Sequence, residues 1–272
     1  MAQFRIDKCN WFSEFNKKCE NDTKKIIDGI LNHYYANVDD SRIKIDGLNY
    51  NQLCIANDLY VYLTPSIKKN LEAWSNTPLS KFIGVIVKDG ADIFDHFGTK
   101  QSQCVSHILR YLKGAYDFSK RKSPLRMKKL LTSVNRERNK LIENGETKFS
   151  DKAIKDIENK YLMIIEEWKK EFEKDKNSET YKEERQLLKR MELKDKKQIL
   201  AFIYDFKIPS TNNNAEACQR GLKVKQKIGE FRSESGASNY CVAKSIILTL
   251  KKQGKDLFTS INKIFNNEPV LA

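Results

Sequence analysis

Several features that would assign a protein class are absent from this sequence of 272 residues. No apolar run approaches the ~18 residues of a membrane-spanning helix. Met1–Phe15 has no basic segment followed by a continuous apolar one, as a secretory signal would. No two of the six cysteines are spaced C-x-x-C, which argues against a structural zinc site of two such pairs. We therefore expect a cytoplasmic protein whose thiols are free.

What the sequence does have is positive charge. Lys and Arg number 50 against 36 Asp and Glu, a net charge of +14, while 40% of the residues are hydrophobic. That apolar content is sufficient for the core of one or two domains. The charge excess fits either a basic, soluble surface or a surface that binds nucleic acid, and charge alone does not decide between them.

The N-terminal part predicts strands. Asn37–Ile45 alternates apolar and polar residues at its end, and Asp46-Gly47 supplies a hairpin turn. Two further strands are expected at Gln52–Ala56 and Tyr60–Leu63, and Pro65 should end that run.

The remaining segments predict one buried strand and several helices. Lys81–Val87 is a continuous β-branched and apolar run, as in a central strand buried on both faces. Helical spacing of apolar residues is found at residues 10–35, Ser66–Trp74, Thr99–Phe118, 119–197 and Val242–Leu250. The fold class is therefore α/β. Its expected divisions are a helical lead-in (1–36), a first core part (37–118), an all-helical insertion (119–200) and a C-terminal core part (201–272).

Three acids occupy positions where catalysis is possible. Asp39 lies on the first strand, Asp89 follows the buried strand, and Glu216 starts a basic helix. Carboxylates brought together repel one another, and divalent magnesium, which prefers hard oxygen ligands, relieves that repulsion. Three acids with two metal ions suit phosphodiester displacement. Taken singly, each acid is more often an ordinary turn or helix-cap residue.

The local sequences around these acids resemble a known family. Ile208–Ala237 reads I-P-S-T-N-N-N-A-E-A-C-Q-R-G-L-K-V-K-Q-K-I-G-E-F-R-S-E-S-G-A. It resembles the C-terminal motif of the insertion sequence 66 family of transposases, in which a proline and two asparagines precede Ala-Glu-Arg and a Lys-x-Lys-x-Lys run leads into Phe-Arg-Ser. Phe82–Lys113, with Cys104-x-x-His107-x-x-Arg110, is also similar to that family. Asn37–Ser41 resembles its first-Asp motif more loosely.

This resemblance implies an RNase H-like mixed sheet with flanking helices and a DDE transposase activity. It assigns Asp39, Asp89 and Glu216 as catalytic residues and as ligands of two Mg²⁺ or Mn²⁺ ions. The implied partners are DNA, as transposon ends and as target, and a further copy of the chain on DNA. The implied location is the bacterial nucleoid within the cytoplasm, without a membrane.

The sequence departs from the family pattern at three points. Ala217 stands where the family has Arg, and Ser41 stands where it has Thr. The N-terminal recognition and zinc-binding regions of full members have no counterpart, so we expect an N-terminally truncated catalytic core.

Other residues have two interpretations each. Five basic residues are candidate phosphate contacts or a solvated helix face: Arg220, Lys223, Lys225, Lys227 and Arg232. His107 and Arg110 either support the second Asp or serve helix packing, and Asn212 and Asn213 either brace Glu216 or cap its helix.

Two further patterns favour a structural interpretation. A zinc site at Cys104 and His107 would need two more ligands, so a buried thiol and a hydrogen-bonded histidine are favoured. The apolar stripe around Trp168 is expected to be core of the insertion rather than a base-stacking platform.

The leading hypothesis is thus a transposase that nicks transposon ends and joins the freed 3′-hydroxyl to target DNA. A truncated, non-catalytic DNA-binding remnant of a transposase is the alternative. A standalone RNase H-like nuclease is a third.

Overall fold

The structure is a computed structural model that describes residues 12–174, 182–193 and 196–271. Its contacts divide the chain into two compact units. The first unit comprises residues 1–86, 91–99 and 213–272, and the second comprises residues 87–90 and 100–212. The start of the predicted lead-in helix, at residues 10 and 11, lies outside the described residues. So do residues 175–181 and 194–195 of the predicted insertion.

In the described part of the chain, five strands form one sheet in the order β3-β2-β1-β4-β5. Their bounds are β1 Tyr35–Ile45, β2 Leu48–Ala56, β3 Val61–Ser66, β4 Val85–Lys88 and β5 Lys100–Gln103. The first three strands are antiparallel, with Ile45 opposite Leu48 and Ala56 opposite Val61. Asp46 and Gly47 both have positive φ, at 49° and 75°, which is the conformation of the predicted hairpin turn.

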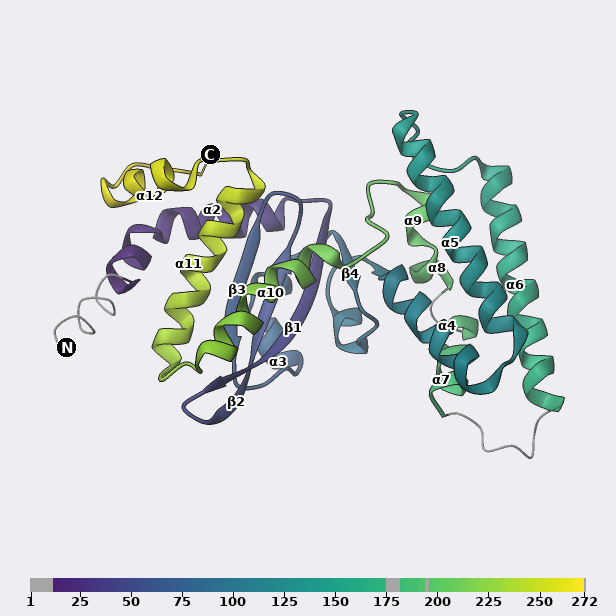
Figure 1. The fold of residues 1–272 in the computed structure, drawn as a ribbon. Helices are drawn as coiled ribbons and strands as arrows, with labels where there is room; N and C mark the ends of the chain where they lie inside the picture. Colours follow the sequence, from purple (N-terminus) through teal and green to yellow (C-terminus); the bar gives the residue numbers. More distant parts are fainter. Residues whose placement is uncertain (1–11, 175–181, 194–195, 272) are drawn as a thin grey trace. The chain divides into compact units, whose positions relative to one another are not determined.

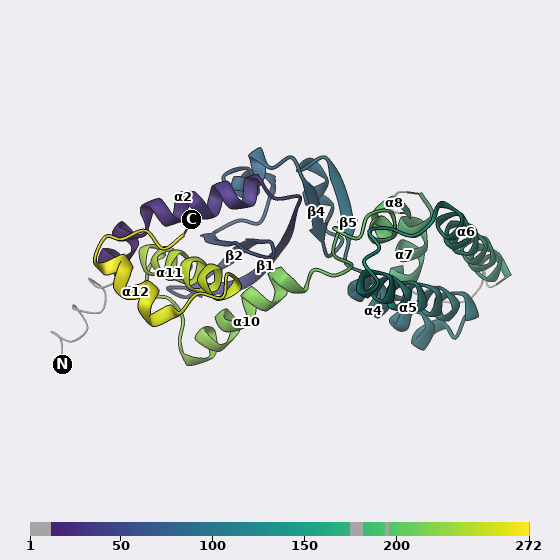
Figure 2. The ribbon, with the colours of Figure 1, turned by 90° about the horizontal axis from the view of Figure 1, so that it is seen from above.

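The helices of the first unit cover two faces of this sheet. They are α2 (Glu20–Leu31), α3 (Leu71–Ser75), α10 (Asn213–Ile228), α11 (Glu234–Lys252) and α12 (Leu257–Phe265), with short 3₁₀ turns at Pro78–Lys81 and Asp92–His96. Residues 12–18 are also helical. In Figure 2, α2 and α10 lie on opposite sides of the strands.

Successive residues of a strand face opposite sides of the sheet, because their side chains point in opposite directions. Val38, Leu53 and Ile55 pack in one core with Ile26 and other residues of α2. Cys54 and Ala56 pack in a second core with residues of α10 and α11, and the outer ends of β1 and β2 pack in a third with Leu222 of α10. Both faces of the hairpin therefore pack against helices of the first unit.

The edge strand β3 is covered by helix α11, which runs beside it (Figure 1). The backbone N–H of Val61 donates to the hydroxyl of Thr249 at 3.0 Å, and that of Leu63 donates to the hydroxyl of Ser245 at 2.9 Å. Both hydroxyl-bearing residues are buried in α11. The outer N–H groups of the edge strand thus bond to helix side chains rather than to another strand.

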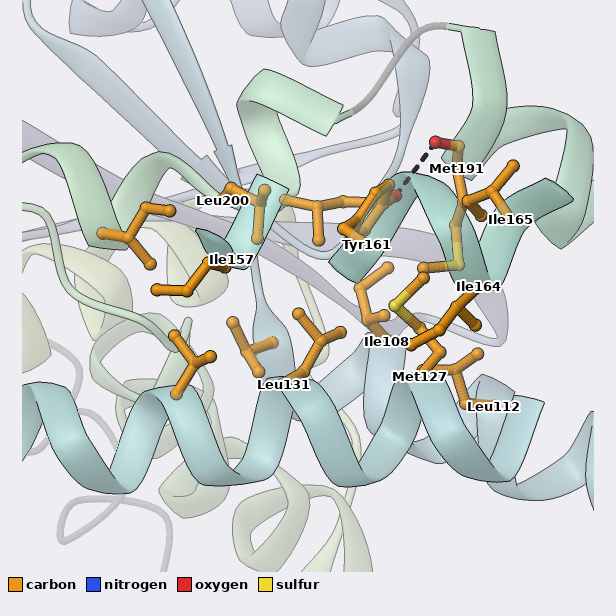
Figure 3. Packing of buried hydrophobic residues seen from close by; sticks show 14 of the residues in the cluster. Ile108, Leu112, Met127, Leu131, Ile157, Tyr161, Ile164, Ile165, Met191 and Leu200 are labelled. Carbon is orange, nitrogen blue, oxygen red and sulfur yellow. Dashed lines mark hydrogen bonds between the residues drawn. The ribbon is translucent and has the colours of Figure 1, made fainter. Parts of the chain in front are cut away.

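The second unit is mainly helical. Its helices are α4 (Val105–Ser119), α5 (Lys122–Glu143), α6 (Asp151–Lys174), α7 (Lys182–Leu193), α8 (Lys196–Ile199) and α9 (Ala201–Tyr204). Figure 3 shows its apolar core, where Tyr161 donates a hydrogen bond of 2.9 Å to the carbonyl of Met191. Trp168 is fully buried here, as expected, and its indole N–H bonds to Glu184 at 2.9 Å.

Four expectations about secondary structure are wrong in detail. The strand predicted at Lys81–Val87 is confined to Val85–Lys88, because Pro78–Lys81 forms a 3₁₀ turn before it. Residues Lys100–Gln103 form β5, whereas the sequence predicted a helix from Thr99. Pro65 does not end β3, which continues to Ser66; the strand is at the edge of the sheet, where a residue without an N–H is tolerated. Helical structure in Ser66–Trp74 begins only at Leu71, after the N-cap residue Asn70. Between residues 119 and 197, the described segments contain helices and no strand, as predicted.

Candidate functional site

Asp39 lies on the face of β1 that is covered by α10. Across the β1–β2 pair it stands opposite Cys54, whose side chain belongs to the core shared with α10. The carboxylate is half-buried, and its Oδ1 accepts the N–H of Asp40 at 2.9 Å. Asp40 points to the other face, where its carboxylate pairs with Lys69 at 3.5 Å. The two adjacent acids therefore have separate surroundings.

Glu216 is in the first turn of α10, where a negative charge is favoured by the helix dipole. The buried face of α10 consists of Ala215, Cys218, Gln219 and Leu222, at the three- and four-residue spacing of one helical face. Glu216 is half-buried at the margin of that face. Lys225 and Lys227 in the last turn complement the opposite end of the dipole.

Contacts on both sides of Glu216 tie α10 to the strand segment that carries Asp39. The Cys54 thiol lies 3.8 Å from the carbonyl of Ala215. One turn further on, the buried Gln219 amide donates to the carbonyls of Gln52 at 3.2 Å and of Asp39 at 3.5 Å. Ala215 and Gln219, the residues on either side of Glu216 that face the sheet, thus hold the first turns of α10 against the strands that carry Asp39 and Cys54.

Two thiols lie beneath this pair of acids. The pKa of Cys54 is raised well above its usual value, chiefly by a hydrogen bond with Cys218 and by burial, with a smaller effect of the Asp39 charge. The pKa of Cys218 is lowered, first by the hydrogen bond from Cys54 and then by the charges of Lys252 and Lys244, against the effect of burial. The negative charge of Asp39 thus contributes to the raised pKa of a thiol in the core next to α10.

The N-terminus of α10 is braced by residues that the sequence did not single out. The amide of Asn214 donates to Asp58 at 3.3 Å, and its carbonyl oxygen accepts from Lys252 at 3.0 Å. Lys252 also donates to the carbonyl of Asn57 at 2.8 Å, so that the β2–β3 turn and the helix share one ammonium. The sequence indicated an asparagine-rich cap here, but nothing in it pointed to a lysine 38 residues later in the chain.

Asp89 lies in the second unit, directly after β4, and its surroundings there are basic and aromatic. The pKa of Tyr111 is raised by burial and by the charge of Asp89, while Arg190 and Arg110 act in the opposite direction. Gly90 has a φ of 112°, and a Cβ at this position would collide with the guanidinium of Arg190. The positive φ after Asp89 therefore favours glycine, and the guanidinium of Arg190 lies close against this residue.

The other expected supporting residues are divided between the two units. His107 is half-buried in α4, with its ring 6.2 Å from that of Tyr111, and Arg110 is exposed on the same helix. Asn212, in the second unit, is buried, and its N–H donates to the thiol of Cys104 at 3.2 Å. Asn213 is the exposed first residue of α10. Within the first unit, Asn214 rather than Asn213 makes the bracing contacts described above.

Three of the five basic candidates share one stripe of α10 with Glu216. Arg220, Lys223 and Lys227 follow Glu216 at intervals of four, three and four residues, which places them on one side of a helix. All three are exposed. At 1.5 Å per residue the stripe extends about 16 Å from the acid. We call Arg220, Lys223 and Lys227 the basic stripe.

Lys225 and Arg232 are outside this stripe. The ammonium of Lys225 donates to the carbonyl of Gly229 at 2.6 Å and lies 4.7 Å from the ring centroid of Phe231. Phe231 in turn exchanges backbone hydrogen bonds with Lys44 and Asp46 at the end of β1. Lys225 thus contacts the residues that follow its own helix, while Arg232 is exposed in that following segment.

Within the described residues, no helix is both long and apolar enough to cross a membrane. No curated protein and no solved structure matches this chain. A family model described as Transposase IS66 family matches residues 8–239, which is most of the chain and includes Asp39, Asp89 and Glu216. The chain therefore belongs to the IS66 family of transposases.

Proposed function

We propose that this protein is a DDE transposase, which cleaves DNA and joins the freed 3′-hydroxyl to a second DNA, with Asp39, Asp89 and Glu216 as its acids. Transposition as the general function follows from the family. The observation that carries the finer proposal is the packing of α10 on β1, with Glu216 between two residues that contact the Asp39–Cys54 pair. The order of the sheet adds support for Asp89, because β4 is the neighbour of β1. An RNase H-like sheet is part of the same proposal.

The donor set fits a divalent metal ion. Carboxylate oxygens are ligands of Mg²⁺ and Mn²⁺, and two half-buried acids on one face gain from a cation that relieves their repulsion. The nearby thiols of Cys54 and Cys218 are buried between β2 and α10 and are hydrogen-bonded to each other. Asp39, Asp89 and Glu216 would hold the ions, two of which is the usual number for phosphodiester displacement. When bound, the ions activate the attacking oxygen and neutralise charge on the phosphate.

The chain's own residues bind and orient the DNA in this proposal. The basic stripe begins beside Glu216 and contacts successive phosphates, which adds affinity without reading bases. Gln219 and Lys252 fix the helix that carries both the acid and the stripe, so that the backbone of the DNA is positioned relative to the acids. The proposed partners are transposon ends, target DNA and a further copy of the chain on DNA.

The first experiment measures nicking of a supercoiled plasmid with Mg²⁺ or Mn²⁺. We expect Asp39→Asn and Glu216→Gln to abolish nicking, because each removes a ligand charge and preserves side-chain shape. Asp40→Asn and Glu230→Gln are the matched controls, since Asp40 faces Lys69 and Glu230 is exposed beyond the end of α10. Equal nicking by wild type and Glu216→Gln would refute the assignment of Glu216.

A strand-transfer assay distinguishes a transposase from a nuclease and from a non-catalytic DNA-binding protein. A labelled oligonucleotide with a free 3′-hydroxyl becomes joined to the plasmid only if the protein transfers strands. Nicking without joining would indicate a nuclease. DNA binding with neither reaction would indicate a non-catalytic DNA-binding protein.

The second experiment tests the basic stripe by the salt dependence of DNA binding. Each phosphate contact contributes about 0.9 to the slope of log K against log salt, so Lys223→Ala with Lys227→Ala should reduce that slope by about 1.8. Lys251→Ala with Lys263→Ala removes the same charge from exposed positions of α11 and α12 and should leave the slope nearly unchanged. Equal slopes for the two double variants would mean that the basic stripe does not contact DNA phosphates.

A further inference from the structure

Helix α10, which carries Glu216, begins at a series of hydrogen-bonded polar side chains from four elements of the first unit. These residues are Tyr35 at the start of β1, Asp58 in the turn between β2 and β3, Asn214 in the first turn of α10 and Lys252 at the end of α11. We call these four residues the polar chain. Because β1 also carries Asp39, the polar chain connects the strand of one proposed acid to the helix of another.

Asp58 joins β1 to α10. Its Oδ1 accepts the phenol O–H of Tyr35 and the side-chain N–H of Asn214, the latter at 3.3 Å. Tyr35 is buried, and its ring centroid lies 4.9 Å from that of His33. Burial and then the hydrogen bond to Asp58 raise the pKa of Tyr35, so the phenol keeps its proton and remains a donor.

The turn that carries Asp58 is fixed by the residue before it. The side-chain oxygen of Asn57 accepts the backbone N–H groups of Leu59 and Tyr60, at 2.9 and 2.8 Å. The amide of Asn57 donates to the carbonyl of Gly29 in α2 at 3.3 Å, and this side chain is fully buried. Although Asp58 is exposed, the backbone next to it is therefore held both within the turn and by α2.

The amide of Asn214 has one orientation that fits its neighbours. Its nitrogen faces the carboxylate of Asp58, and its oxygen accepts from the ammonium of Lys252 at 3.0 Å. A rotation by half a turn would place oxygen against the carboxylate and N–H groups against the ammonium. Hydrogen bonds to charged groups are the stronger ones, so the two opposite charges fix this side chain. The ammonium also donates to the carbonyl of Asn57 at 2.8 Å, which returns the polar chain to the turn.

Asn214 and Gln219 attach α10 on the two sides of Glu216 in the sequence. Gln219 donates to the carbonyls of Asp39 and Gln52, as described above, and Asn214 is two residues before Glu216. The first turn of a helix tends to fray, because its N–H groups have no partner within the helix. Attachments on both sides of Glu216 therefore restrict the movement of its backbone.

We propose that the polar chain positions Glu216 for a divalent metal ion, with Asp58 and Asn214 as its central positioning residues. This inference rests on the proposed function, in which Glu216 is a metal ligand. A carboxylate on a backbone that is already fixed loses less freedom when an ion binds. Replacing residues that orient a metal ligand typically lowers metal affinity by about 10- to 100-fold.

The experiment measures the dissociation constant of Mn²⁺ for the whole protein by electron paramagnetic resonance, without DNA. Asn214→Leu removes both hydrogen bonds of the amide at similar volume and without a change of charge, and it should weaken Mn²⁺ binding about tenfold. Tyr35→Phe removes the donor at the other end of the polar chain and should weaken the binding less. Lys252→Arg keeps a charged donor and should bind Mn²⁺ nearly as tightly as the wild type.

Two controls separate positioning from a general effect of substitution. Asn213→Leu makes the same change at the exposed residue next to Asn214, and Tyr60→Phe removes a phenol hydroxyl near Asp58 but outside the polar chain. Both variants should bind Mn²⁺ as the wild type does. Each measurement is made well below the unfolding midpoint of the variant, so a loss of stability alone does not alter the affinity.

Each contrary result overturns a specific statement. Unchanged Mn²⁺ binding in both Asn214→Leu and Tyr35→Phe would mean that the polar chain is only structural, while nicking that depends on Glu216 would keep the proposed function intact. Equal weakening by Asn213→Leu and Asn214→Leu would also overturn the role of the polar chain. If the wild type binds Mn²⁺ no more tightly than Glu216→Gln, Glu216 is not a metal ligand, and the inference and the acid assignment fail together.

Discussion

Arg138 is the residue whose replacement should most disturb the second unit. It is 7% exposed in α5, and its guanidinium donates to three backbone carbonyls of a separate segment. Its Nε bonds to Phe202 at 3.1 Å, while its Nη2 bonds to Phe206 at 2.7 Å and to Ile208 at 2.9 Å. The side chain thus fixes the segment that follows α9.

The expected cost follows from these three bonds. A hydrogen bond to a charged group contributes about 1.5 kcal/mol or more, so three of them contribute about 5 kcal/mol. Burial lowers the pKa of Arg138, which shows that the charge is held at some cost, and Arg138→Met removes that cost as well. We expect a net loss of about 3 kcal/mol for Arg138→Met. Arg138→Lys should lose about half as much, because one ammonium group cannot reach all three carbonyls.

The assay is urea unfolding followed by the fluorescence of Trp168, which is buried in the same unit, with Trp11 and Trp74 replaced by phenylalanine. With a slope near 2 kcal/mol per molar, the midpoint should fall by about 1.5 M. Arg136→Met is the control, since Arg136 is exposed on the same helix. If the midpoints of Arg138→Met and Arg136→Met coincide, the three carbonyl bonds do not stabilise the unit and the reasoning is wrong.

Three further predictions concern local features. Gly90→Ala should destabilise the second unit by about 2 kcal/mol because of its positive φ. Gly114→Ala, in open space on a helix, should stabilise the same unit by up to about 1 kcal/mol, and thermal unfolding measures both effects. The Cys218 thiolate should form at lower pH than that of Cys54, and Cys54→Ala should raise the pKa of Cys218; an unchanged thiolate absorbance titration would exclude their hydrogen bond. The hydroxyl of Ser233 accepts the N–H of Gly236 in the first turn of α11 at 3.1 Å. Ser233→Ala should therefore lower the free energy of unfolding in urea by about 1 kcal/mol. An unchanged free energy of unfolding would mean that water replaces the cap.

The elements with strong local signals were predictable from the sequence. The alternation in Asn37–Ile45, the Asp46-Gly47 turn and the stripe around Trp168 each specify a structure through neighbouring residues, and the structure confirms all three. The motif at Ile208–Ala237 also identified the family correctly.

Features that depend on distant partners were not predictable. The segment Lys100–Gln103 contains no β-branched or apolar residue, and it becomes a strand because β4 offers it a backbone partner. Arg190 and Lys252 act through contacts with residues 87 and 38 or more positions away, so no local pattern indicates their partners. Conversely, Lys225 is part of a repeating lysine run, yet its contacts are with the end of its own helix.

The hydroxyl groups of Thr249 and Ser245 also bear on how the protein avoids aggregation. An exposed edge strand presents unpaired N–H groups that can pair with the strand of another molecule. Here two of the outward N–H groups of β3 are already bonded to α11, so a second chain finds no continuous ladder to extend. During synthesis, however, Val61 and Leu63 are made 188 and 182 residues before their partners in α11, and for that interval the edge of β3 stays open to other chains. Replacing both hydroxyls by alanine would leave these two N–H groups without their acceptors under α11, which weakens the cover of the edge strand and favours its pairing with another chain.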